Sequence, residues 1–259
     1  MKSPDNLANN LDSFKGYEIF DEIYKRDDIF QYTEGLTKYL HDSKIKDIIF
    51  LDSAARPAWV GIDEYWKQKY ADEVKPGMFF VNPLGFKEVN LEIEDPEDLI
   101  RKMTLINCWR TNQEAFFEAA TTNREEQDII EDFATTYTEL IKDKDEPVLI
   151  FDTCSHTGGT INDVKKILEK VGFKDIKIIT AAPPDQESGL ENSAKIVDKV
   201  WLHHCYPFGK ETSIIRTTDS VVSKRYDYND SAREQAIKTR QEIRQIIKDR
   251  LENPSKLII

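Results

Sequence analysis

The sequence predicts an α/β fold, a doubly wound and mainly parallel five-stranded sheet within a single domain. Five short apolar runs recur along the 259 residues, each typical of a strand covered on both faces. Helical patterns separate these runs, and such alternation favours a parallel sheet with right-handed crossovers. We expect a core over residues 45–202, a helical lid over 1–44, and a hood segment with a carboxy-terminal helix over 203–259.

In the first part of the chain, helical patterns alternate with two strand patterns. Apolar and aromatic residues at helical spacing over 17–40 indicate one or two amphipathic helices packed on the core. Ile45–Leu51 is the first predicted strand, and the turn D-S-A-A-R-P (52–57) follows it. Pro57 opens a helix that reaches about Tyr70. Gly77–Val81 is then the second strand.

The patterns weaken between residues 82 and 142. Residues 82–111 alternate briefly and turn helical after Asp95-Pro96, so we interpret them as an insertion or a mobile hood. The acidic run over 88–98 is typical of a solvated face rather than a metal site. Gln113–Lys142 predicts a long amphipathic helix, with a break around 121–123 as the alternative.

The second half predicts three further strands and two helices. Val148–Phe151 is the third strand, and Asp152 stands at its carboxyl end. The next helix runs from near Ile161 to Val171 and stops at Gly172, a residue suited to the left-handed conformation. The remaining elements are strands at Ile176–Thr180 and Val197–Leu202 and a final helix at Asn229–Leu251.

The stretch P-V-L-I-F-D-T-C-S-H-T-G-G-T (147–160) joins the third strand to its helix. Its hydroxyls, its glycines and the first N–H groups of the helix favour a bound phosphate. If the strand order is flavodoxin-like, the first and third strands are neighbours, and the turn over 52–57 flanks the same crevice. The sequence therefore predicts that Arg56 and this stretch converge on one phosphorylated ligand.

This stretch resembles the ribose-phosphate motif of type I phosphoribosyltransferases, in which a hydrophobic strand runs into two acids and a T-G-x-T turn. The resemblance implies that residues 157–160 cradle the 5′-phosphate and that Asp152 holds ribose hydroxyls. Thr153 occupies the place of the second acid. The turn D-S-A-A-R-P sits where the family has its pyrophosphate-binding loop, which implies that Arg56 contacts pyrophosphate.

The resemblance implies that the chain binds phosphoribosyl pyrophosphate with Mg²⁺ and transfers ribose 5-phosphate to a nucleobase or related acceptor. Asp152, His156 and Arg56 would then be catalytic, and Asp152 and Asp52 would hold the metal. His156 could handle a proton of the base or merely cap the loop, and Asp52 could equally be a turn-forming residue. The ligand-binding set comprises Ser53, Ala54, Ala55, Arg56, Asp152, Thr153, Ser155, His156, Thr157, Gly158, Gly159 and Thr160.

Two other functions use the same residues. A non-catalytic module that senses a nucleotide or phosphoribosyl ligand is favoured by Thr153, because the motif then lacks one carboxylate. A hydrolase that cleaves the glycosidic bond of a nucleotide would share the ribose site. A zinc site is disfavoured because Cys154, His156, His203, His204 and Cys205 lack ligand spacing.

Composition limits the partners. The formal charge is 36 − 48 = −12, which disfavours general nucleic-acid binding. Three scattered cysteines and the absence of a long apolar run lead us to expect a cytoplasmic protein without membrane contact. Members of the family often dimerise, and the aromatic helices of the first 40 residues offer a surface for a homodimer, although core packing explains them equally well.

Overall fold

The computed structural model describes ten stretches of the chain. These are residues 16–52, 55–89, 121–142, 144–153, 159–180, 193–194, 214–215, 220–222, 224–225 and 230–254. The strand predicted at 197–202 and the helical turn predicted after Asp95-Pro96 lie outside them.

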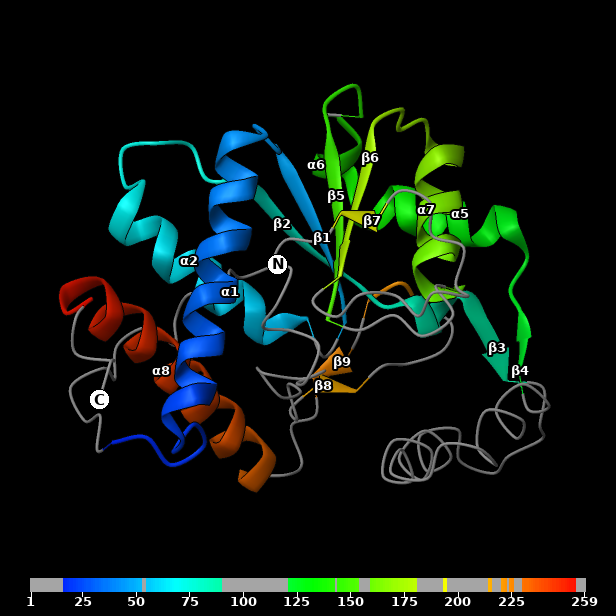
Figure 1. Cartoon of the computed structure of the whole chain (residues 1–259). Helices are drawn as coiled ribbons and strands as arrows, with labels where there is room; N and C mark the ends of the chain where they lie inside the picture. Colours follow the sequence, from blue (N-terminus) through cyan, green and yellow to red (C-terminus); the bar gives the residue numbers. More distant parts are fainter. Residues whose placement is uncertain are drawn as a thin grey trace.

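A parallel sheet forms the centre of the molecule (Figure 1). Its main strands are β1 (Asp47–Leu51), β2 (Gly77–Val81), β5 (Val148–Asp152) and β6 (Ile176–Thr180), in the order β2-β1-β5-β6. The two-residue β7 (Ser193–Ala194) extends the sheet beside β6. Phe50 of β1 aligns with Phe80 on one side and with Phe151 on the other. The first and third core strands are therefore neighbours, as expected for a flavodoxin-like order.

Three helices cover one face of this sheet, namely α1 (Ile23–Asp42), α2 (Arg56–Lys69) and α8 (Asp230–Glu252) (Figure 1). Period-3.6 apolar positions of α1, including Tyr32 and Leu36, pack on Phe50 and Phe151, whose side chains point to this face. Ile243 of α8 joins the same cluster. A single helix therefore covers residues 23–42, and it is a layer of the core.

The opposite face is covered by α5 (Glu126–Thr136), α6 (Thr138–Lys142) and α7 (Gly159–Val171) (Figure 1). Ile49 and Ile150 point to this side, because successive side chains of a strand face opposite ways. They meet Phe133 of α5 and Val164 of α7, both fully buried. The run of apolar residues in β1 and β5 is thus explained by two covered faces.

The helix predicted at Gln113–Lys142 is confirmed over most of residues 126–142, but it is not continuous. Residues 121–123 form β4 (Thr121–Asn123), which pairs in antiparallel fashion with β3 (Lys87–Val89). Tyr137, with φ −110° and ψ 44°, then separates α5 from α6. The alternative break at 121–123 was the better interpretation, although its form is a strand. Residues 113–120 lie outside the description.

The other predicted elements agree with the structure to within a few residues. The strands predicted at 77–81 and 176–180 match β2 and β6 exactly in extent, and β1 begins two residues after the predicted Ile45. Gly172 ends α7 with φ +106°, as its position after the apolar periodicity indicates. A short helix η2 (Pro83–Phe86) and a hairpin of β8 (Ile214–Ile215) and β9 (Lys224–Arg225) complete the fold.

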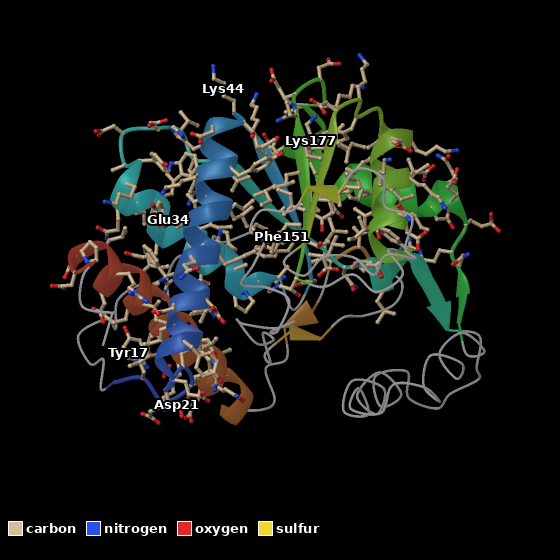
Figure 2. All side chains as sticks on the ribbon, viewed as in Figure 1. Tyr17, Asp21, Glu34, Lys44, Phe151 and Lys177 are labelled. Carbon is tan, nitrogen blue, oxygen red and sulfur yellow. The ribbon has the colours of Figure 1, made fainter. Side chains whose placement is uncertain are left out.

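The chain segment before α1 is fastened to α8. Consecutive backbone N–H groups of Glu18, Ile19 and Phe20 donate to the carboxylate of Glu242, at 2.9 to 3.1 Å. The Tyr17 hydroxyl donates to Asp249 at 2.7 Å. Figure 2 shows Tyr17 beside α8, at the end of the molecule opposite Lys44 and Lys177. The two ends of the described chain are therefore held together.

Candidate functional site

The polar residues that follow the core strands gather at one edge of the sheet. Asp52 follows β1 and its N–H donates to the carbonyl of Val81 at 2.9 Å, which continues the pairing of β1 with β2. Extending the β1–β5 register by two residues sets Asp52 opposite Thr153. Neighbouring strands are about 4.8 Å apart. Asp52, Asn82 and Thr153 therefore form one row across the carboxyl edge, where ligands bind in open parallel sheets.

Arg56 and Asp52 form a two-point ion pair in this row. Arg56 Nη2 donates to Asp52 Oδ2 at 3.0 Å, and Nε donates to Oδ1. The Asp52 side chain is 0% exposed, whereas the Arg56 side chain is 23% exposed. Parallel N–H···O bonds of this kind are among the strong hydrogen bonds of proteins. The arginine assigned to pyrophosphate thus lies at the predicted edge, with its charge already paired.

The ring of Phe80 supports the same guanidinium. The Arg56 Cζ lies 4.2 Å from the ring centroid, and Trp59 of α2 packs edge-on against Phe80 at 5.8 Å between centroids. Stacking on an aromatic face fixes the plane of a guanidinium and adds a cation–π attraction. Arg56 is therefore oriented from two directions, by Asp52 and by Phe80. The residue begins α2, with Pro57 in the first turn as predicted.

Asp152 ends β5 and remains partly exposed at the edge. Its Oδ1 accepts the N–H of Thr153 at 2.7 Å. Thr153 itself is 2% exposed, and its hydroxyl has no hydrogen-bond partner among the described residues. Thr153, which occupies the place of the second acid in the phosphoribosyltransferase motif, is thus buried at the start of the turn. Asp152 is the half-exposed carboxylate of this pair.

Tyr32 of α1 packs on Phe151, the residue before Asp152, with 5.8 Å between the ring centroids. Burial, with the Asp152 charge as the second cause, holds the pKa of the Tyr32 phenol well above its ordinary value. The phenol therefore stays protonated and adds no second negative charge near Asp152. Periodicity assigned Tyr32 only to the core, so its nearness to the strand end was not predicted.

The turn that would hold phosphate is described at its two ends. Gly159 and Thr160 are exposed and form the first residues of α7, and the positive end of a helix dipole favours an anion. The helix begins two residues earlier than the predicted Ile161. Ser53, Ala54, Ser155, His156, Thr157 and Gly158 lie outside the described residues. Ala55 is fully buried, and it forms part of the core beneath α2.

A second group of polar residues ties the segment 220–222 to the edge. Asn82 donates through its N–H to Val221 at 2.8 Å and through Nδ2 to the carbonyl of Ser220 at 3.0 Å. The Tyr137 hydroxyl lies within hydrogen-bond reach of the carbonyls of Val221 (3.1 Å) and Phe80. Asp132 Oδ2 accepts the Val221 N–H at 3.0 Å. Burial, with the Asp52 charge as the second cause, raises the pKa of Tyr137.

Sequence reasoning missed this second group. Asn82 directly follows β2, so the strand-end rule that selected Asp52 and Asp152 would have selected it too. Tyr137 was grouped with the apolar face of a helix, although its hydroxyl needs a partner when buried. The contacts of 220–222 carry no local signal, because they join residues more than 80 positions apart.

No group of three or more His, Cys, Asp or Glu side chains is arranged as a metal site within the described ranges. Magnesium commonly binds through one or two carboxylates together with phosphate oxygens of a substrate. The half-exposed Asp152 fits that smaller requirement. Among the helices that the structure describes, none is long and apolar enough to cross a bilayer.

We found no family model, curated protein or solved structure that matches this chain significantly. The likeness to type I phosphoribosyltransferases therefore rests on the motif residues alone.

Proposed function

We propose that this protein binds phosphoribosyl pyrophosphate with Mg²⁺ and transfers ribose 5-phosphate to a nucleobase or related acceptor, with release of pyrophosphate. The observation that carries the proposal is the adjacency of β1 and β5. It sets Asp52 and Asp152 at neighbouring strand ends, Arg56 is paired with Asp52, and α7 is the helix that follows β5 in the chain. A cation, a carboxylate and a helix start at one edge suit the pyrophosphate, the ribose and the 5′-phosphate of that ligand.

Each residue has a distinct part in the proposed reaction. The turn over 157–160 and the first N–H groups of α7 hold the 5′-phosphate, and Asp152 accepts hydrogen bonds from ribose hydroxyls. Positive charge develops at the anomeric carbon while pyrophosphate leaves, and Arg56 offsets the negative charge gathering on the leaving oxygens. His156 takes a proton from the incoming base. Orientation of donor and acceptor supplies the remaining rate enhancement.

Magnesium fits this assignment through Asp152 and the oxygens of the ligand. When bound, the ion would neutralise part of the pyrophosphate charge. The other assigned metal ligand, Asp52, has both carboxylate oxygens engaged with Arg56.

A non-catalytic module that binds the same ligand is the second candidate. The burial of Thr153 favours it, because the position that carries an acid in the family offers no carboxylate and little surface. Such a module would bind phosphoribosyl pyrophosphate without consuming it.

The test is release of labelled pyrophosphate from phosphoribosyl pyrophosphate with Mg²⁺ and a panel of acceptors. Release that depends on one acceptor and falls strongly in Arg56→Ala would support the transferase. Lys67→Ala is the matched control, because Lys67 is a cation exposed on the same helix. Saturable binding without turnover would support the module. Products from a nucleotide alone would indicate a hydrolase, and neither binding nor release would contradict the proposal.

A further inference from the structure

The charge of Arg56 is neutralised by a carboxylate that water does not reach. Asp52 engages Nε and Nη2, the two donors that form one edge of the guanidinium. A guanidinium has five N–H donors, so three remain for a ligand. The Asp52 side chain is buried and the Arg56 side chain is partly exposed, so an incoming phosphate can reach Arg56. The nearby negative charge of Asp52 weakens the attraction between Arg56 and that phosphate.

Phe80 orients Arg56 independently of Asp52. The Phe80 ring lies under the guanidinium, and Phe80 is itself fixed by Trp59 at its ring and by the Tyr137 hydroxyl at its carbonyl. None of these contacts involves the Asp52 carboxylate. Removing the charge of Asp52 would therefore leave the direction of Arg56 largely unchanged and would expose its full positive charge to a ligand.

We propose that Asp52 is an internal counter-ion that limits the affinity of Arg56 for pyrophosphate, and that it is not a metal ligand. This inference rests on the proposed function and assigns a regulatory part to a residue of the same site. Asp52 stays on the Nε and Nη2 edge while pyrophosphate uses the three remaining donors, so its negative charge weakens the hold of Arg56 on the product. Departure of product limits the turnover of many enzymes, and a nearby carboxylate lowers that barrier.

The two roles for Asp52 predict opposite effects of one substitution. If Asp52 competes with the ligand, Asp52→Asn strengthens pyrophosphate binding, because a buried negative charge near a polyanion is removed. If Asp52 holds Mg²⁺, Asp52→Asn weakens binding when Mg²⁺ is present and has little effect without it. The affinity for pyrophosphate in the absence of metal therefore distinguishes the two roles, because Asp52→Asn raises it only if Asp52 competes with the ligand.

The experiment is calorimetric titration of the full chain with pyrophosphate, first in EDTA and then with excess Mg²⁺. We expect Asp52→Asn to bind pyrophosphate about tenfold more tightly than the wild type in EDTA, and we expect added salt to shrink the difference. The gain in affinity for pyrophosphate should be smaller with Mg²⁺, because the ion already offsets part of the negative charge of the ligand. Asp63→Asn is the control, since Asp63 is a covered acid of α2 paired with Lys67 and Lys75.

Unchanged or weaker binding by Asp52→Asn in EDTA would overturn the inference while leaving the proposed function intact. A loss confined to Mg²⁺ conditions would also overturn it, in favour of a metal ligand. Failure of pyrophosphate to bind either protein would contradict both the inference and the proposed function, whereas binding only by the variant would support the counter-ion role. Should Asp52→Asn fail to fold, Asp52→Ser removes the same charge with a smaller side chain and carries the same expectation.

Discussion

The Glu242 carboxylate is buried, and it accepts hydrogen bonds from backbone N–H groups in place of water. It is 1% exposed, and three successive N–H groups from residues 18–20 donate to its two oxygens. A carboxylate satisfied in this way is tolerated in the interior, whereas removal of its charge leaves donors facing a weaker acceptor. The residue thus holds the segment before α1 against α8.

We therefore expect Glu242→Gln to lower the free energy of unfolding by roughly 1.5–3 kcal/mol, the range for hydrogen bonds to a charged group. Urea unfolding followed by circular dichroism measures this. The control is Glu234→Gln, an exposed position on the same helix, which should stay within about 0.5 kcal/mol of the wild type. Equal stability of the two variants would show that the backbone contacts contribute little.

His41 predicts a pH dependence at the far end of α1. Its Nδ1 lies 2.9 Å from Asp42 and its Nε2 lies 3.0 Å from Glu73, while its ring stacks on Tyr70 at 4.2 Å. The hydrogen bond to Asp42, with the Glu73 charge in support, raises the pKa of the imidazole above its ordinary value. A raised pKa in the folded state stabilises the protein most where the histidine is charged in both states.

The stability advantage of the wild type over His41→Gln should be complete below the unfolded-state pKa of about 6.5. It should then fall as pH rises through the higher pKa of the folded state. Melting temperatures of both proteins at pH 5.5, 7 and 8.5 measure the trend. A difference that stays constant or grows with pH would show that the two carboxylates do not favour the charged imidazole.

At the scale of elements, the local sequence pattern predicted most strands of the parallel sheet but not the two small antiparallel pairs. β2 and β6 are bounded by breakers and polar residues, so their apolar runs defined them to the residue. β4, with the sequence T-T-N, has no strand pattern of its own and forms through its partner β3, more than thirty residues away. Tertiary pairing overrode the helical periodicity that surrounds it.

Contact between η2 and the segment 220–222 provides a test at this scale. A Cβ added at Gly85 would lie 1.7 Å from the carbonyl oxygen of Ser220, a backbone atom that cannot turn aside. Gly85→Ala should therefore displace 220–222 and lower stability by about 1–3 kcal/mol, the range for overpacking. Hydrogen exchange at the Val221 amide should accelerate, while the Gly172 amide at the opposite edge should be unaffected. Unchanged protection at Val221 would contradict this close approach.

At the scale of the whole molecule, strand order connects sequence to site. Alternating strands and helices predicted a parallel sheet, and the order β2-β1-β5-β6 is the flavodoxin-like one on which the meeting of Asp52, Arg56 and Asp152 at one edge depends. The ion pair that covers Asp52 was not anticipated, because it depends on how the turn over 52–57 closes. Nor were Asn82 and Tyr137, whose partners lie in the distant segment 220–222.

The most direct measurement is calorimetric binding of phosphoribosyl pyrophosphate, with Mg²⁺, to the wild type and to Asp152→Asn. We predict one site per chain in the wild type and binding at least tenfold weaker in the variant, which loses the charge that accepts ribose hydroxyls. Asp175→Asn, an acid at the opposite edge of the sheet, should bind like the wild type. Absence of binding by the wild type, or equal binding by Asp152→Asn, would contradict a phosphoribosyl site at the carboxyl edge of this sheet.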